Sequence, residues 1–209
     1  MDGVYIDGRW RSGSGVHFEN HCPATGDVVW EGNGASEAEV NEAVASARRA
    51  FTKWAHMPQG DRTAILERYA EEIAKRADAI AETVSRDMGK ALWESKSEAA
   101  TMKAKVGVSI AAQVERAGTK FSSANCGSSH LTHRPHGVMA VFGPFNFPGH
   151  LPNGHIVPAL LAGNTCVFKP SELAPLGPLA VGELTAGLFP DGVVSIVPGG
   201  PATGDALVR

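Results

Sequence analysis

Hydrophobic residues recur at helical spacing through most of the first half of the chain. Ser36 and Glu39 stand three residues apart, as in a capping box, directly before one such apolar series. Asp61 and Gly89 bracket a second series, as the cap and the stop of a helix would. The pattern predicts three amphipathic helices, over residues 37–54, 62–88 and 92–116. Their charged faces are expected to be solvated.

Shorter extended segments precede these helices. Residues 4–6 and 9–10 flank the pair Asp7-Gly8, which supplies the positive φ angles that a type I′ turn needs. A second extended pair is expected around the turn at residues 23–26. The amino-terminal segment is therefore predicted to form two hairpins ahead of the helical region.

The pattern changes at residue 118, where serines replace the charged helical sequence. Short segments on either side of residues 125–127 predict a protruding hairpin. Beyond it, residues 137–142 form a nearly continuous apolar run, as expected of a strand buried on both faces of a parallel sheet. Helices and strands then alternate, with helices expected at residues 155–161 and 176–188 and strands at residues 165–168 and 193–197.

This order predicts an α/β fold: a helical amino-terminal region, followed by the first β-α-β-α-β units of a doubly wound parallel sheet with right-handed crossovers. Residues 199–209 indicate a glycine loop that turns into a new helix. A parallel sheet that stopped there would leave an apolar strand edge unpaired, which folded proteins avoid. We therefore expect further chain after Arg209.

Composition narrows the classes of partner. A net charge of −3, with 43% hydrophobic and 20% charged residues, lacks the basic bias of proteins that bind nucleic acids or anionic membranes. The sequence shows neither a signal peptide nor an apolar stretch long enough to span a membrane, so we expect a cytoplasmic protein. Cys22, Cys126 and Cys166 are odd in number and widely spaced, which favours free thiols over disulfides or a zinc site.

In open α/β sheets ligands bind beyond the carboxyl ends of the strands, and the loop after the first predicted strand is unusual. Residues 142–148 place two prolines and a glycine around Asn146. A rigid backbone leaves the Asn146 amide as a preset hydrogen-bond donor, which suits an oxyanion hole. The competing interpretation is an Asx turn within a proline-rich loop.

The next two loops also carry candidate ligand contacts. Lys169 and Glu172 are held at the end of the second strand by Pro170. The carboxylate can accept hydrogen bonds from ribose hydroxyls and the lysine can approach a ribose or phosphate oxygen, while a surface ion pair is the alternative. Three glycines after the third strand give close backbone access to a flat ligand such as adenine: Gly199, Gly200 and Gly204.

The histidines near these loops have competing interpretations. His130, His133 and His136 are evenly spaced, but on a strand His133 would point to the opposite face, which favours three separate side chains over a metal site. His150 and His155 follow the Asn146 loop and either pack against a helix or contact an anionic substrate. No bound metal is expected.

Taken in order and at their spacing, the motifs of the whole chain resemble those of the aldehyde dehydrogenase family. The resemblance rests on residues 23–26, 88–90, 134–138, 143–148, 158–165, 169–172 and 198–204. Phe145 departs from the pattern because many members carry tryptophan there, an aromatic exchange that is compatible with a cofactor cleft. Residues 147–158 are most similar to the branch that oxidises N-succinylglutamate 5-semialdehyde to N-succinylglutamate in arginine catabolism.

The resemblance implies a Rossmann-like fold, NAD as the hydride acceptor and a small aldehyde as the substrate. It gives Asn146 the role of oxyanion donor and has Lys169 and Glu172 hold the adenosine ribose. The negative charge of Glu172 favours NAD over NADP because it repels a 2′-phosphate. The other residues expected at the cofactor are Phe142, Gly143, Pro144, Phe145, Ser171, Gly199, Gly200 and Gly204.

The resemblance also divides the chain. Residues 1–119 and 137–209 correspond to the amino-terminal part of an NAD-binding domain, and residues 120–136 to a hairpin of an oligomerisation arm, which implies a homo-oligomer. The family's cysteine nucleophile, general-base glutamate and catalytic domain would lie beyond Arg209, so the 209 residues alone are expected to be inactive. The alternatives are a stand-alone module that binds NAD or pairs with a full-length subunit, and a decayed gene product.

Overall fold

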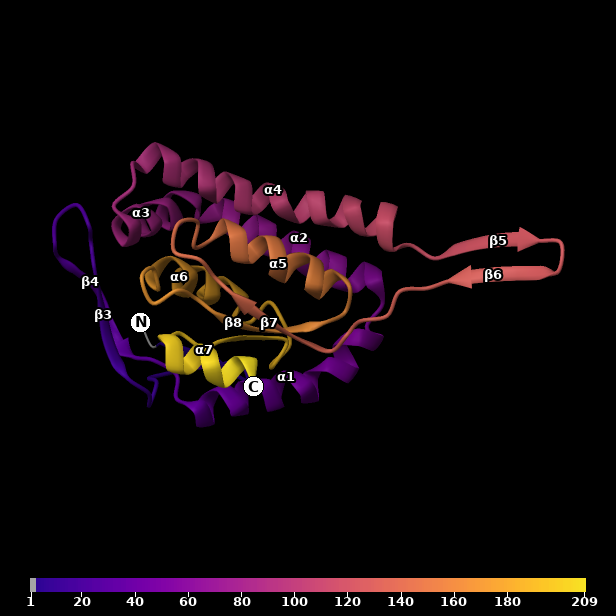
Figure 1. The fold of residues 1–209 in the computed structure, drawn as a ribbon. Helices are drawn as coiled ribbons and strands as arrows, with labels where there is room; N and C mark the ends of the chain where they lie inside the picture. The colour runs from indigo at the N-terminus through magenta and orange to yellow at the C-terminus, as the bar shows by residue number, and fades with distance from the viewer. Residues whose placement is uncertain (1–2) are drawn as a thin grey trace.

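A five-stranded mixed sheet forms the centre of the computed structural model, which describes residues 3–209 (Figure 1). The strands lie in the order β2-β1-β9-β8-β7. Their bounds are β1 Val4–Ile6, β2 Arg9–Arg11, β7 Val138–Phe142, β8 Thr165–Lys169 and β9 Val194–Ile196. Because β7, β8 and β9 are parallel and joined by helices, the predicted α/β fold is confirmed, and β1 adds an antiparallel neighbour to β9.

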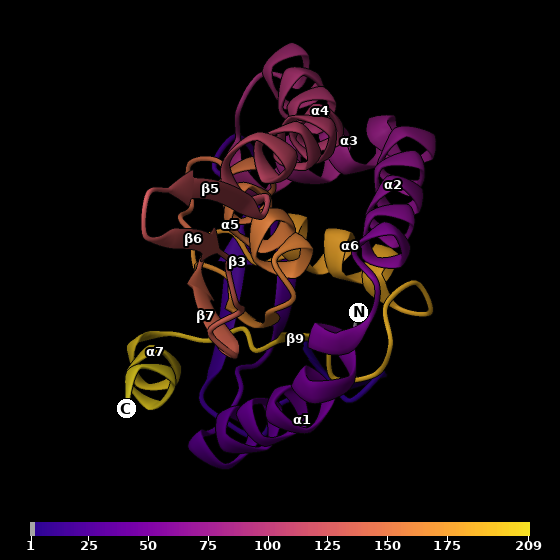
Figure 2. The same cartoon turned by 90° about the vertical axis from the view of Figure 1, so that its right-hand side faces the viewer.

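Helices lie in one layer on one face of this sheet and in two layers on the other (Figure 2). The helices are α1 Glu37–His56, α2 Gln59–Lys75, α3 Ala77–Met88, α4 Leu92–Ala117, α5 His150–Leu161, α6 Leu176–Thr185 and α7 Pro201–Val208. α1 and α7 share one face, α5 and α6 cover the other, and α2, α3 and α4 pack over α5 and α6. The largest apolar cluster fills the space between these helical layers, so the loops at the strand ends rest on a close-packed base.

The exposure of β7 differs from its prediction. This strand was expected to be buried on both faces, but only Val141 of its residues is buried, and Phe142 is 44% exposed. β7 is the outermost parallel strand, and within residues 3–209 it pairs with β8 alone. The central strand β8, in contrast, is buried at every position. An apolar run predicts a strand without distinguishing an inner strand from an edge.

Within residues 3–209, the unpaired apolar edge that the sequence predicted lies at β7, and β9, the third predicted strand, is not an edge. Tyr5 of β1 pairs with Ile196 of β9, so β9 has neighbours on both sides. The hairpin that supplies β1 is confirmed, since Asp7 and Gly8 take φ angles of 52° and 77° between β1 and β2. The second predicted pair is also present, as β3 His17–His21 and β4 Val28–Asn33. The first hairpin therefore covers an edge that the order of elements left open.

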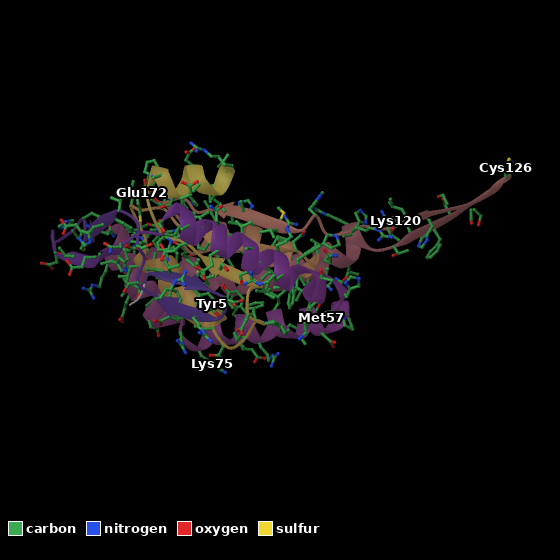
Figure 3. All side chains as sticks on the ribbon, turned by 90° about the horizontal axis from the view of Figure 1, so that it is seen from below. Tyr5, Met57, Lys75, Lys120, Cys126 and Glu172 are labelled. Atoms are coloured by element: carbon green, nitrogen blue, oxygen red, sulfur yellow. The ribbon has the colours of Figure 1, made fainter. Side chains whose placement is uncertain are left out.

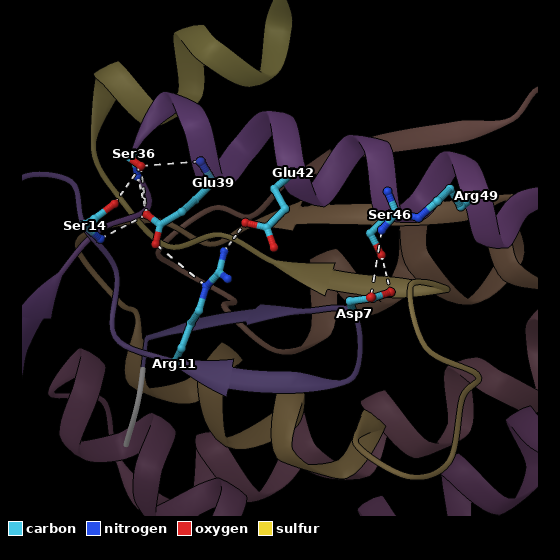
Figure 4. Close-up of polar contacts among 8 residues, drawn as sticks. All are labelled: Asp7, Arg11, Ser14, Ser36, Glu39, Glu42, Ser46 and Arg49. Atoms are coloured by element: carbon cyan, nitrogen blue, oxygen red, sulfur yellow. Dashed lines mark hydrogen bonds and ion pairs between the residues drawn. The ribbon is translucent and has the colours of Figure 1, made fainter.

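Polar contacts fix the start of α1 to the amino-terminal segment (Figure 4). The predicted capping box is confirmed: the Glu39 amide donates to Ser36 Oγ at 3.4 Å, and the Ser36 amide donates to the Glu39 carboxylate at 2.8 Å. The Ser14 amide donates to the same carboxylate at 3.0 Å. Burial raises the pKa of Glu39, but these hydrogen bonds outweigh burial and leave the pKa below its ordinary value. Further along α1, Ser46 donates to Asp7 at 2.7 Å.

The helix predicted over residues 62–88 is two helices, α2 and α3. Arg76 separates them because it leaves helical geometry, with φ −109° and ψ 15°. The apolar rhythm continues across this break, so periodicity alone gave no sign of it. Asp61 lies in the first turn of α2 and does not cap it, since the cap position is Pro58. Gly89 ends α3 in the left-handed conformation, as predicted.

A two-stranded hairpin projects from the body of the molecule after α4 (Figures 1 and 3). It consists of β5 Lys120–Ala124 and β6 Gly127–Leu131, at the predicted place. Phe121 is 74% exposed and stacks on His130, with ring centroids 4.2 Å apart. Within the described part of the chain, no helix is long and apolar enough to cross a membrane. Residues 1–2, which begin the expected NAD-binding part, lie outside the described residues.

Candidate functional site

The loops at the carboxyl ends of β7, β8 and β9 meet at one edge of the sheet. The Gly143 amide donates to the Lys169 carbonyl at 2.9 Å, which ties the first loop to the end of β8. The Val197 amide donates to the Phe168 carbonyl at 2.9 Å, which ties the third loop to the same strand. The three loops that the sequence singled out are thus neighbours at the edge where α/β sheets bind ligands.

Lys169 links the second loop to the third. Its ammonium group donates to the carbonyl oxygens of Pro170, at 3.0 Å, and of Gly199, and to the Glu172 carboxylate at 3.3 Å. The Lys169 side chain is 10% exposed and the Glu172 side chain 38%. All three N–H groups of the lysine therefore have a protein acceptor. The acceptor that a ligand can replace is the half-exposed carboxylate.

A groove of about 390 Å³ lies beside this pair, between α7 and the start of α1. Glu172, Gly199 and Ala35 are among the residues that line it. Gly199 has a φ of 151°, and a Cβ atom there would come within 2.1 Å of Thr203 Oγ1, so this position requires glycine. Thr203 Oγ1 donates to the Ala35 carbonyl at 2.7 Å, which holds α7 against the segment before α1. The groove has the size of a site for a small molecule.

Three other predicted residues take different positions around this groove. Gly200 lines it and has open space where a Cβ would lie, so its backbone is accessible. Gly204 packs against the lysine instead of lining the groove, since a Cβ there would be 3.4 Å from Lys169 Cε. Ser171 Oγ accepts a hydrogen bond from the Leu173 amide at 3.2 Å and thereby closes the turn that carries Glu172.

The loop after β7 exposes aromatic and amide side chains. Phe142 and Phe145 are 44% and 50% exposed, whereas Gly143 and Pro144 are half-buried. Gly143 lies so close to an aromatic ring of β8 that a Cβ would approach it within 2.8 Å. Asn146 is exposed, and its side chain makes no hydrogen bond within residues 3–209. The alternative Asx turn is therefore not formed there, and the amide is available to a ligand.

A lysine and a glutamate that sequence reasoning missed hold both ends of this loop. Lys90 Nζ donates to the Asn146 carbonyl at 2.9 Å and to Glu98 Oε2 at 2.9 Å. Glu98 Oε1 accepts from the amides of Gly149, at 3.0 Å, and His150, at 3.1 Å. The Lys90 and Glu98 side chains are 11% and 0% exposed. The sequence predicted that Glu98 lies on a solvated helix face. This prediction is wrong because charge alone does not show which side of a helix is covered by other segments.

A second buried carboxylate, Asp87, anchors the helix that follows the second loop. Its oxygens accept from the Gly177 amide at 2.8 Å and from Asn20 Nδ2 at 2.6 Å. Burial raises the pKa of Asp87 to about 6, although the two hydrogen bonds favour the charged form and oppose this rise. Asp87 is 1% exposed. It therefore joins the amino-terminal segment to the start of α6, and no cation within residues 3–209 pairs with it.

The histidines do not form a metal site in the described structure. His130 lies on β6, while His133 and His136 lie outside any strand, so the argument from alternating faces does not apply to them. No group of three or more His, Cys, Asp or Glu side chains within residues 3–209 is arranged to hold a metal ion. His150 contacts the Phe147 ring, and its buried Nδ1 has no hydrogen-bond partner in this part of the chain. His155 is exposed on α5.

The three cysteines are free thiols in different surroundings. Cys166 is buried in β8, and burial raises the pKa of its thiol to about 12. Cys22 is 7% exposed, and a hydrogen bond from Thr25 lowers the pKa of its thiol. Cys126 is exposed at the tip of the β5–β6 hairpin (Figure 3). None of them lies in the three loops at the strand ends.

Comparison with known proteins covers nearly the whole chain. Residues 10–209 match the model of the aldehyde dehydrogenase family. The sequence is 54% identical over 207 residues to N-succinylglutamate 5-semialdehyde dehydrogenase 2 of Caulobacter vibrioides, and 54% identical over 211 residues to N-succinylglutamate 5-semialdehyde dehydrogenase of Burkholderia mallei. These matches cover 99% and 100% of this chain but 43% of each relative, so the chain spans less than half the length of these curated relatives.

Solved structures show the same arrangement of sheet and helices. A putative aldehyde dehydrogenase from Burkholderia cenocepacia superposes with a TM-score of 0.91 at 32% identity, and PnpE in complex with nicotinamide adenine dinucleotide with 0.91 at 31%. Each covers 99% of this chain and 43% of the other. An NADP-dependent glyceraldehyde-3-phosphate dehydrogenase from Bacillus halodurans C-125, complexed with NADP, gives 0.92 at 26% identity, over 99% of this chain and 45% of that one.

Proposed function

The chain belongs to the aldehyde dehydrogenase family, and from this we propose that it forms the cofactor-binding side of an enzyme that oxidises an aldehyde to a carboxylic acid with NAD. The observation that carries the proposal is the meeting of three loops at one sheet edge, where Glu172 borders a groove and Asn146 presents an unpaired amide. Because the chain spans 43% of its curated relatives, we propose the reaction for a protein of the relatives' length that contains these 209 residues, the full chain.

The groove beside Glu172 suits the adenosine part of NAD. Its walls combine apolar side chains, such as Phe18 and Ala35, with the bare backbone of Gly200, and a flat base can pack against both. Glu172 can exchange its 3.3 Å contact with Lys169 for hydrogen bonds from ribose hydroxyls, while Lys169 keeps its two carbonyl acceptors. A 2′-phosphate would meet the negative charge of Glu172, so NAD is preferred to NADP.

The loop after β7 serves the reacting end of the cofactor and the substrate. NAD, when bound, supplies the acceptor for the hydride. The half-exposed rings of Phe142 and Phe145 offer an apolar surface beside Gly143 and Pro144, and the Asn146 amide donates to the oxygen that becomes negatively charged. The cysteines of this chain do not lie at these loops, so the nucleophile is assigned to other residues of the full chain.

The substrate we propose is N-succinylglutamate 5-semialdehyde, oxidised to N-succinylglutamate in arginine catabolism. The support is the 54% identity to two relatives that carry this substrate in their names, across 99% or more of the chain. The solved structures at 26–32% identity include other aldehyde dehydrogenases. They support the oxidation of an aldehyde, but they do not indicate which aldehyde is the substrate. The substrate assignment therefore depends on the sequence relatives.

The chain also divides by proposed role. Residues 1–119 and 137–209 form the amino-terminal part of the NAD-binding domain, and residues 120–136 form part of an oligomerisation arm of a homo-oligomer. The projection of β5 and β6 from the body, with Phe121 74% exposed, supports the arm. We place the enzyme in the cytoplasm, in keeping with its three free cysteines.

Calorimetry and a reduction assay on the full chain test this function. Glu172→Ala removes hydrogen bonds to a charged group and is expected to weaken NAD binding by about 10- to 100-fold. Glu71→Ala, at an exposed position of α2, serves as the matched control and is expected to leave NAD affinity unchanged.

NADH formation is expected from the full chain with N-succinylglutamate 5-semialdehyde, and much less from glutamate 5-semialdehyde, which lacks the succinyl group. The 209 residues alone are expected to give no turnover. Absence of NAD binding to the full chain would contradict the cofactor proposal. Equal turnover of the two aldehydes would contradict the proposed substrate but would leave the proposed cofactor and reaction class in place.

A second candidate function is a stand-alone module that binds NAD or pairs with a full-length subunit, without catalysis. The observation that favours it is that the walls of the groove come from this chain itself, from Gly15 to Arg209. It predicts that the 209 residues bind NAD, with the affinity lost in Glu172→Ala, or that they co-purify with a full-length subunit. Absence of heat on titration with NAD, together with aggregation of the 209 residues, would exclude it.

A further inference from the structure

We propose that Lys90 and Glu98 are positioning residues for the reaction: as a buried ion pair they set the backbone of residues 146–149 and thereby aim the Asn146 amide. This inference rests on the proposed role of Asn146 as the oxyanion donor. Neither side chain lines the groove beside Glu172, so both would act through the loop.

The pair connects the two ends of a short segment. At the first end, Lys90 Nζ donates to the Asn146 carbonyl at 2.9 Å. At the other end, Glu98 Oε1 accepts from the Gly149 and His150 amides at 3.0 and 3.1 Å. The lysine and the glutamate are themselves 2.9 Å apart. Three charge-assisted contacts to the backbone thus fix where the peptide of Asn146 lies relative to the start of α5.

Neighbouring contacts restrict both members of the pair. The Ser85 hydroxyl donates to the Lys90 carbonyl at 2.7 Å, and Lys90 Nζ lies 4.4 Å from the centre of the Phe147 ring within the loop. Gly149 lets the loop approach α4 closely, since a Cβ there would come within 2.6 Å of Met102 Sδ. Movement of the loop would therefore have to displace a buried charge or a buried side chain.

Stability alone does not account for this arrangement. The cost of removing two charges from water largely cancels their attraction, so a buried ion pair often contributes no more than apolar side chains of similar volume. What an apolar pair cannot supply is directed hydrogen bonding to three backbone groups of one loop. A second pair, between α4 and α3, provides the contrast: Lys96 and Asp78 are 3.1 Å apart and exposed, and their pairing does not involve the loop.

Steady-state kinetics of the full chain test the inference. Asn146→Ala is expected to lower kcat by about 10²- to 10³-fold, as the loss of an oxyanion donor does. Lys90→Met is expected to lower kcat at least tenfold and to leave the Kd for NAD unchanged. The double variant is expected to be no slower than Asn146→Ala, because the pair acts only through that amide. Lys96→Met is the matched control, with unchanged kcat.

The outcomes separate this inference from the proposed function. If Asn146→Ala keeps the original kcat, the proposed function of Asn146 fails. If Asn146→Ala is slow while Lys90→Met is as fast as the unmodified protein, or if the two losses multiply in the double variant, only the positioning inference fails.

If Lys90→Met does not fold, hydrogen exchange of a second variant, Glu98→Gln, tests the inference without an activity assay. Glu98→Gln keeps an oxygen for the Gly149 and His150 amides but removes the charge that pairs with Lys90. Hydrogen exchange of these two amides is expected to become at least tenfold faster in Glu98→Gln, with no change at Leu179 on α6. Unchanged exchange at Gly149 and His150 would overturn the inference.

Discussion

Two lysine–glutamate pairs flank the same edge of the sheet, and they differ in how much water reaches the carboxylate. Lys90 and Glu98 are 2.9 Å apart, with side chains 11% and 0% exposed. Lys169 and Glu172 are 3.3 Å apart, with side chains 10% and 38% exposed. Both lysines also donate to backbone carbonyls of neighbouring loops. Only the second carboxylate is open to water, so only Glu172 can change partners without itself becoming a buried, unpaired charge.

The difference separates a fixed contact from an exchangeable one. Glu98 accepts from two backbone amides in addition to Lys90, so its removal leaves both amides without this acceptor and Lys90 with the longer, 3.9 Å ion pair to Glu94. Glu172 has Lys169 as its partner and faces the groove, so a ligand hydroxyl can take over part of the interaction. The same two residue types thus hold a loop in one place and receive a ligand in the other.

Glu98→Ala breaks the fixed contact and is expected to have the largest effect. Removal of the carboxylate leaves the two backbone amides without this acceptor and Lys90 with the longer, 3.9 Å ion pair to Glu94, which is expected to lower the free energy of unfolding by about 3–5 kcal/mol. Urea denaturation followed by circular dichroism measures it. Asp78→Ala, which removes the exposed partner of Lys96, is the control and is expected to leave the midpoint in place. Equal midpoints for the two variants would show that the Lys90–Glu98 contact is no more fixed than the exposed pair of Lys96 and Asp78.

Asp87 sharpens the comparison because it is buried like Glu98 but pairs with no cation in the described part of the chain. Its pKa of about 6 in the folded chain exceeds the ordinary 3.8, so the folded state binds the proton more tightly. Stability from this group is therefore full below the unfolded pKa and is lost as pH rises through about 6, by about 3 kcal/mol in total.

Denaturation between pH 4 and pH 8 measures this effect, as the difference between the unmodified chain and Asp87→Asn. The variant should lack the additional loss of stability as pH rises, because asparagine does not titrate. Parallel curves for the two proteins would show that Asp87 keeps an ordinary pKa in the fold.

Glu172→Gln addresses the exchangeable contact and is expected to have the smallest effect on folding. Since the side chain is 38% exposed, the free energy of unfolding should change by no more than about 0.5 kcal/mol. The ratio of the Kd values for NAD and NADP should shift toward NADP, because the repelling charge is gone. Titration of both cofactors measures this ratio. A large loss of stability would mean that Glu172 is as fixed as Glu98.

The features that the sequence predicted correctly depend on neighbours in the chain. Ser36 and Glu39 form their capping box within one turn, and Asp7-Gly8 determines its hairpin locally. The ion pair of Lys169 and Glu172, which was the alternative to ligand contact, likewise spans only three residues. All the residues that form these features lie within a few positions of one another, so a single sequence is enough to predict them.

The features that were missed depend on contacts between distant segments. Asn20 and Asp87 meet across 67 positions, and Glu98 reaches Gly149 across 51. The break at Arg76 interrupts a rhythm of apolar residues that continues on both sides. The edge position of β7 follows from the strand order, which places β9 between β8 and the amino-terminal hairpin. Composition and periodicity contain none of this information.

The hairpin of β5 and β6 carries its one thiol at the point farthest along the projection (Figure 3). Cys126 is exposed, whereas Cys22 is 7% and Cys166 0% exposed. A maleimide dye added briefly should therefore attach first at Cys126. The molecule thus carries a built-in labelling position, from which fluorescence anisotropy can measure how rigidly the hairpin is held and energy transfer can detect a second copy beside it.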